Sequence, residues 1–337
     1  MAASPARARG GVLPDPGHPF ERGAVLGAGT MGAQIALSLA LGGLPVRLWG
    51  RRDASLPAAM ERVGAAFDFL AASGLADADE REAVLARIDT TTELSEAVGG
   101  TGRAFVIEAV AEELDVKRAL LAEAERSAAA ADMLSSTTSA LGATAIQSAL
   151  ADPSRFAIAH YAQPAHLVKL VEVVPGERTD EATVEAVTAL LTATGKTPVR
   201  CPDIPGFLWA RIQHAVLREF ATLVGKGLVT PEACDTVLKE GYAARLPAMG
   251  AFEHADLAGL DLMNGDAAKA VWADLSTVAD PSYTPVGGLY AEGALGMRSG
   301  RGFYDWRERD PEAFKAARDR EIVRRVKIQA GGEVVLD

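Results

Sequence analysis

The sequence has few cysteines and no excess of positive charge, and each shortage excludes a class of protein. Cys201 and Cys234, its two cysteines, are too few for a disulfide framework or a metal site, so we predict no bound metal. The net charge of −11 argues against a nucleic acid or an anionic membrane as a partner. No apolar run reaches the roughly 20 residues of a membrane-spanning helix, and we find no internal repeat.

The N-terminal segment, residues 1–20, lacks the apolar core of a signal peptide. Its sequence, MAASPARARGGVLPDPGHPF, predicts a disordered lead-in and a cytoplasmic protein. The chain of 337 residues is long enough for two ordinary domains, each with its own core.

Short apolar runs alternate with helix-period segments over residues 21–203, which predicts a doubly wound α/β domain. The expected strands cover residues 23–26, 45–49, 104–108, 133–136, 156–159, 167–174 and 197–200. The motif CPDIPG at 201–206 ends this alternation, and the segments that follow are helical, including one that begins after a Thr230 cap. We therefore expect an all-α domain over residues 204–310 and a C-terminal extension over 311–337.

A glycine-rich turn follows the first strand and precedes the first helix. It contains Gly27, Gly29 and Gly32 in a G-x-G-x-x-G pattern, with Thr30 and Met31 between them. Glycines in this position allow a tight turn and close approach of a pyrophosphate to the helix N-terminus. We predict a dinucleotide site; the alternative is a glycine-rich turn in a nucleotide-free domain.

The end of the second strand is where a dinucleotide-binding domain reads the ribose of its cofactor. An acidic residue there binds the 2′-hydroxyl of NAD, but this chain has Gly50, Arg51 and Arg52. Two guanidinium groups suit a 2′-phosphate, so we predict NADP, with NAD as a possible cofactor. The alternative is that both arginines are solvated and NAD binds without a ribose anchor.

A histidine and a glutamate lie in two neighbouring apolar runs. Glu172 interrupts the run LVEVV, and a buried carboxylate requires a partner. If the strands are adjacent, His160 is the nearest candidate, and the pair would leave one imidazole nitrogen free as a general base. The alternative is that the two side chains are exposed and separate.

Several motifs in order resemble the 3-hydroxyacyl-CoA dehydrogenase superfamily over roughly Ala24–Trp306. They are GAGTMG (27–32), VIEAVAEELDVK (106–117), SSTTSAL (135–141), HYAQPAHLVKLVEVV (160–174), DIPGF (203–207), AMGAFEHADLAGLD (248–261) and GMRSGRGFYDW (296–306). The resemblance implies a Rossmann-type NAD(P)-binding domain, here 21–203, followed by an all-α dimerisation domain. It also implies an oxidoreductase that acts on a CH–OH group, as a homodimer.

The resemblance assigns roles to five residues. His160 matches the catalytic base, Glu172 the carboxylate that orients it, and Ser139 the serine that hydrogen-bonds the reacting oxygen. Glu112 and Lys117 match residues that line the cofactor pocket.

The chain departs from the family near the substrate. Gln163 and Ala210 stand where the family has active-site asparagines, Thr137 replaces another asparagine, and Gly50 replaces the ribose-binding aspartate. The expected substrate is a 3-hydroxy or 3-oxo carboxylate or its thioester. The sequences of residues 170–186 and 211–220 resemble those of branches of the superfamily such as L-gulonate 3-dehydrogenase, which favours a small acid as the substrate. The alternative function is a catalytically silent, nucleotide-binding member with a structural or sensing role.

Overall fold

The computed structural model describes residues 18–329, so most of the predicted disordered lead-in lies outside the described residues. Within this range the chain forms two compact units. The first holds the residues up to Ala210 together with those from Asp319 onward, and the second is Arg211–Arg318. None of the described helices is long and apolar enough to cross a membrane.

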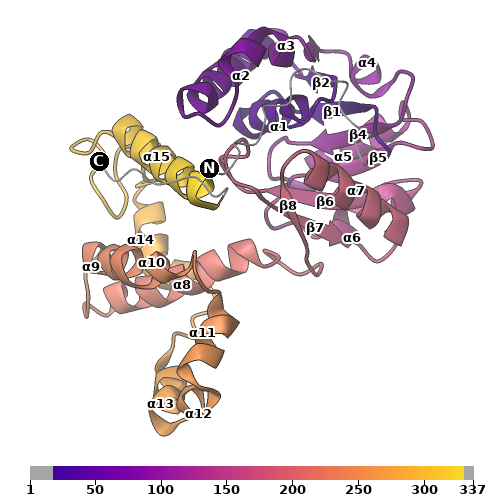
Figure 1. Ribbon diagram of the computed structural model, residues 1–337. Coiled ribbons are helices and arrows are strands. Elements are labelled where there is room, and N and C mark those ends of the chain that lie inside the picture. The colour runs from indigo at the N-terminus through magenta and orange to yellow at the C-terminus, as the bar shows by residue number, and fades with distance from the viewer. Residues whose placement is uncertain (1–17, 330–337) are drawn as a thin grey trace, which may run out of the picture. The chain divides into compact units, whose positions relative to one another are not determined.

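The first unit is built on one eight-stranded sheet with the order β3-β2-β1-β4-β5-β6-β7-β8 (Figure 1). Strands β1 to β6 are parallel; β7 runs antiparallel to β6, and β8 is parallel to β7. The strands are β1 Arg22–Leu26, β2 Val46–Trp49, β3 Ile88–Thr91, β4 Ala104–Glu108, β5 Met133–Ser136, β6 Phe156–Tyr161, β7 Leu170–Pro175 and β8 Thr197–Arg200.

Helices cover both faces of the sheet, which explains why β4 and β6 are apolar along almost their whole length and fully buried. One core contains side chains of α1 (Thr30–Leu41), α2 (Ser55–Ala72), α3 (Arg81–Leu85) and α7 (Glu181–Ala193). The other contains side chains of α4 (Leu94–Val98), α5 (Leu114–Glu125) and α6 (Ala143–Gln147). The strand order reverses at β1, so a crevice for a ligand is expected at the carboxyl ends of β1 and β4.

The second unit is helical. Its helices are α8 (Trp209–Gly225, which begins in the first unit), α9 (Pro231–Thr236), α10 (Ala243–Arg245), α11 (Ala251–Ala258), α12 (Leu260–Met263), α13 (Asp266–Asp274) and α14 (Pro285–Ala291). Thr230 caps α9 as predicted, since its hydroxyl accepts the Ala233 N–H at 3.2 Å. Helix α13 begins at Asp266, with Gly265 as its N-cap.

A final helix, α15 (Pro311–Gln329), lies in the C-terminal extension, for which we predicted no helix or strand. Val323, near its end, is buried in the core of the first unit, and Ile322 packs against the same core. The chain therefore returns to the first unit after the helical unit.

Candidate active site

The glycine turn joins β1 to α1 at the point where the strand order reverses. Gly27 has a φ of +138°, and a Cβ there would lie 2.4 Å from the carbonyl oxygen of Ala109. A Cβ on Gly32 would lie 1.7 Å from the Gly27 oxygen, whereas a Cβ on Gly29 would have no neighbour within 4 Å. Packing therefore requires glycine at 27 and 32, and Gly29 leaves the approach to α1 open.

The first turn of α1 carries Thr30, Met31 and Gly32, and no side chain caps this end of the helix. Its backbone N–H groups and the positive end of the helix dipole are therefore available to an anion. This arrangement fits the pyrophosphate of a dinucleotide.

An acidic residue at the end of β2, where a ribose would be held, would require neighbouring side chains to move. A Cβ on Gly50 would lie 2.7 Å from Leu56 and 2.9 Å from the Ser55 hydroxyl oxygen. Arg51 and Arg52 are exposed, and neither forms an ion pair within residues 18–329. The local structure therefore offers guanidinium groups at this position instead of a carboxylate.

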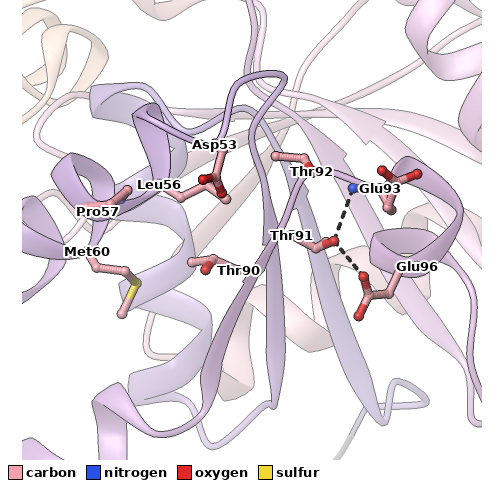
Figure 2. Close-up of a pocket in the computed structure, with 9 residues that line it drawn as sticks. All are labelled: Asp53, Leu56, Pro57, Met60, Thr90, Thr91, Thr92, Glu93 and Glu96. Carbon is pink, nitrogen blue, oxygen red and sulfur yellow. Dashed lines mark hydrogen bonds between the residues drawn. The ribbon is translucent and has the colours of Figure 1, made fainter.

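A cleft of about 460 Å³ lies beside the carboxyl-terminal half of β3, between residues of α2 and of α4 (Figure 2). It is lined by Asp53, Leu56, Pro57, Met60, Thr90, Thr91, Thr92, Glu93 and Glu96. The hydroxyl group of Thr91 donates to the Glu96 carboxylate at 2.6 Å and accepts the Glu93 N–H at 3.1 Å. With three carboxylates in its wall, the cleft does not favour an anion.

His160 and Glu172 are directly opposite each other in the antiparallel pair β6–β7. The imidazole Nδ1 lies 2.7 Å from the Glu172 Oε2, and the side chains are 6% and 2% exposed. An ionised carboxylate only accepts hydrogen bonds, so Nδ1 carries a proton, and in the neutral imidazole Nε2 then has the lone pair. The structure thus brings together the two residues that the sequence placed in neighbouring runs.

The second oxygen of Glu172 accepts three further hydrogen bonds. The N–H groups of Leu208 and Trp209 donate to Oε1 at 2.8 and 2.9 Å, and the Cys201 thiol donates at 3.3 Å. Burial alone would raise the pKa of Glu172, but the hydrogen bonds from His160, Trp209 and Leu208 outweigh it and hold this pKa below its ordinary value. Burial, followed by contact with Glu172, raises the pKa of Cys201 to about 12, so the thiol remains a donor.

A buried ion-pair network follows β4. Glu108 is fully buried and accepts the Val110 N–H, the Ser136 hydroxyl and the Lys117 ammonium group, the last at 2.8 Å. The Lys117 Nζ also lies 3.2 Å from Glu112, whose side chain is half-exposed. Lys117 itself is 1% exposed, and its ammonium group faces the two glutamates.

The loop after β5 forms hydrogen bonds with Glu112 and with the backbone beside His160. Glu112 accepts hydrogen bonds from the Thr138 hydroxyl and from the Ser139 N–H, and the Tyr161 N–H donates to the Thr137 hydroxyl at 3.2 Å. Burial would raise the pKa of Glu112, but the Thr138 hydroxyl and the Lys117 charge hold it below the ordinary value. The Ser139 side chain stays exposed, on a loop anchored beside His160.

The two positions at which the chain departs from the family's asparagines differ in exposure. Gln163 is exposed in the turn after β6, whereas Ala210 is buried just past the amides that bind Glu172.

Sequence reasoning missed Glu108 and the amides of Leu208 and Trp209. The position of Glu108 at the end of the apolar run AFVIE was a signal that a buried charge needs a partner. Backbone amides have no such signal in the sequence.

The glycine turn, the open N-terminus of α1 and the buried histidine–glutamate pair define a nicotinamide-dependent oxidoreductase. Within the described part of the chain, no cluster of His, Cys, Asp and Glu could hold a metal ion. Residues 23–204 match the family described as "3-hydroxyacyl-CoA dehydrogenase, NAD binding domain", and residues 206–306 match "3-hydroxyacyl-CoA dehydrogenase, C-terminal domain". The chain therefore belongs to the 3-hydroxyacyl-CoA dehydrogenase family, and it is an oxidoreductase that acts on a hydroxyl group.

The relatives include enzymes named for a free carboxylate and enzymes named for a coenzyme A thioester. The chain is 30% identical to 5-formyl-3-hydroxy-2-methylpyridine 4-carboxylate 5-dehydrogenase of Mesorhizobium japonicum, over 92% of this chain and 98% of that one. It is 34% identical to a probable 3-hydroxybutyryl-CoA dehydrogenase of Bacillus subtilis, over 85% and 97%. A solved structure of the pyridine-carboxylate 5-dehydrogenase, described as an NAD⁺-dependent dismutase, superposes with a TM-score of 0.85 at 30% identity, covering 93% of this chain and 100% of that one.

Proposed function

We propose that the protein interconverts a 3-hydroxy and a 3-oxo carboxylic acid, or its thioester, with His160 as the general base. The observation that carries this proposal is the buried pair in which Glu172 holds Nδ1 of His160 at 2.7 Å. Nε2 takes the hydroxyl proton while the carbinol hydride leaves, and in reverse the imidazolium returns that proton to the alkoxide. The ionised Glu172 stabilises the imidazolium formed in oxidation.

The nicotinamide cofactor, when bound, accepts or supplies the hydride. Gly27, Gly29 and Gly32 with the first turn of α1 would hold its pyrophosphate. In this proposal Ser139 hydrogen-bonds the reacting oxygen, and Glu112 fixes the Ser139 loop through the amide bond described above.

The proposal extends to the choice of cofactor. Arg51 and Arg52 are exposed, and within the described residues neither has a carboxylate partner, while Gly50 supplies no carboxylate to bind a ribose. Both features support NADP(H) over NAD(H), since a phosphate gains charge-assisted hydrogen bonds from guanidinium groups.

A compact acid is the preferred substrate. Residues 53–89 contain no lysine, and their three arginines are already engaged: Arg62 with the Ala28 carbonyl, Arg81 with Asp68 and Arg87 with the Ala40 carbonyl. This segment therefore offers little positive charge to the phosphates of a coenzyme A tail. The high TM-score to an enzyme named for a free pyridine carboxylate supports the same choice.

The proposal includes a homodimer and a cytoplasmic location. Large apolar side chains of the helical unit are exposed in the single chain, among them Phe252 at 89%, Trp272 at 79% and Ile212 at 67%. Covering such side chains with a second copy would remove apolar surface from water.

The test is a turnover assay with the purified protein, NADPH or NADH, and two substrate sets. One set is acetoacetyl-CoA, and the other is a panel of free 3-oxo acids together with hydroxymethyl aromatic acids, the last of these assayed with NADP⁺ or NAD⁺ because they can only be oxidised. We expect turnover with a free acid at a kcat/KM well above that for the thioester. Cofactor binding without turnover of either set would support the silent alternative, which no observation currently favours.

A further inference from the structure

The linker between β8 and α8, residues 201–209, contains an unusual backbone conformation beside the dyad. Phe207 has a φ of +46°, in the left-handed region that non-glycine residues rarely adopt, and it follows Gly206 at +76°. Such strain persists where the surrounding structure enforces it, and it concentrates at functional sites.

The strained turn directs two consecutive N–H groups at one carboxylate oxygen. Leu208 and Trp209 follow Phe207 directly, and both donate to the Glu172 Oε1, at 2.8 and 2.9 Å. Successive amides in a turn of this kind form a concave anion-binding site. Here the bound anion is the side chain of Glu172, and the thiol of Cys201 from the same linker adds a third donor.

The linker also contacts the base. The Phe207 ring is fully buried and lies 5.8 Å from the His160 ring, centroid to centroid, at an interplanar angle of 58°. One short segment therefore holds both members of the dyad, the carboxylate through hydrogen bonds and the imidazole through packing.

We propose that the linker 201–209 positions the dyad: it fixes Glu172 Oε1 so that Oε2 faces Nδ1 of His160 and holds the imidazole in the tautomer that leaves Nε2 free. Leu208 and Trp209 act through their backbone, and Phe207 through its ring and its conformation. None of the three is required to touch the substrate. The inference rests on the proposed roles of His160 and Glu172, and it adds the segment that fixes the orientation of their side chains.

The decisive comparison is between Trp209→Pro and Trp209→Ala. Both variants lose the indole, but only proline loses the N–H, and proline is well tolerated at the first position of a helix, which Trp209 occupies in α8. We expect kcat of Trp209→Pro to be roughly ten- to a hundredfold below that of Trp209→Ala, with an unchanged KM for the cofactor, because one charge-assisted hydrogen bond is lost. Equal kcat values in the two folded variants would overturn the inference.

A second measurement keeps the inference testable without turnover. In proton NMR spectra of the resting protein, the Nδ1-bound proton of His160 should give a strongly downfield signal that is present in Trp209→Ala and shifted or lost in Trp209→Pro. If Trp209→Pro does not fold, Cys201→Ala should shift the same signal, and Cys201→Ser, which keeps a donor, should restore it. An unchanged signal in every folded variant would overturn the inference. Failure of the proposed function is distinguishable, because it would appear as full activity in a His160→Ala variant whatever the spectra show.

Discussion

Replacing Glu172 by glutamine should nearly abolish turnover, although the change only replaces one carboxylate oxygen by an NH₂ group. The carboxylate accepts four hydrogen bonds, three at Oε1 and one at Oε2. Glutamine has a single oxygen, so its NH₂ group must face either the imidazole Nδ1 or the amides of Leu208 and Trp209.

The two orientations of this glutamine differ in free energy. With the oxygen toward Nδ1, two buried N–H groups lose their acceptor, each at about 1–3 kcal/mol. With the NH₂ group toward Nδ1, the amides stay satisfied and His160 moves its proton to Nε2, where it can no longer act as a base. The first orientation costs at least one unsatisfied amide more than the second, so the fraction of the enzyme with Nε2 free to act as a base falls to about a tenth or less. Loss of the charge that stabilises the imidazolium brings the expected decrease in kcat to about 10²–10⁴-fold.

The assay is steady-state turnover of wild type, Glu172→Gln and a matched control, Glu181→Gln. Glu181 is exposed and pairs with Arg200, so its variant removes the same charge away from the site. We expect normal kcat for Glu181→Gln and near-normal cofactor affinity for both. A Glu172→Gln enzyme within threefold of wild-type kcat would refute the tautomer argument.

Because the pKa of Glu172 is lowered in the folded state, the stability that its charge contributes is present above the unfolded pKa and is lost as the pH falls through the folded value.

Three further outcomes are expected. Lys117→Met should reduce the free energy of unfolding by about 3–5 kcal/mol, because it leaves the fully buried Glu108 unpaired; thermal melts should show no comparable loss for Lys239→Met, whose ammonium group is exposed, and equal melting temperatures would contradict this. The double variant Arg51→Ala/Arg52→Ala should weaken NADPH binding by about one to two decades and leave NADH binding unchanged, as measured by fluorescence titration; equal losses for both cofactors would show that the arginines do not read the 2′-phosphate. Light scattering should give roughly twice the chain mass of 35.2 kDa, and a concentration-independent monomer would contradict the proposed dimer.

The sheet was largely predictable because most of its strands are buried on both faces and therefore appear as bounded apolar runs. The predicted strands at 104–108 and 133–136 match the buried strands β4 and β5 residue for residue, and the strand at 197–200 matches β8, although this edge strand is largely exposed. Strand β3, with the sequence IDTT, was missed because it is an edge strand whose central residues are exposed. Helix α15 was missed because it is highly charged, with Val323 as its buried apolar contact to the first unit.

The active site was predictable as far as side chains carry the signal. A glutamate inside LVEVV requires a partner, and the β6–β7 register supplies His160. The donors on the other side of Glu172 could not be predicted, because they are backbone N–H groups positioned by a left-handed Phe207, and neither feature has a residue-type signature. The pairing of Glu108 with Lys117 likewise depends on a tertiary contact that the spacing of nine residues does not specify.

The central claim is that His160 is the base for hydride transfer, and a single-turnover experiment on His160→Ala tests it most directly. The variant is mixed with saturating oxidised cofactor and the hydroxy acid that the turnover assay identifies, and reduced cofactor is followed by its absorbance. We predict that cofactor affinity is unchanged and that the first-order rate of reduction falls by about 10²–10⁴-fold. Reduction at the wild-type rate would contradict the assignment of His160 as the base.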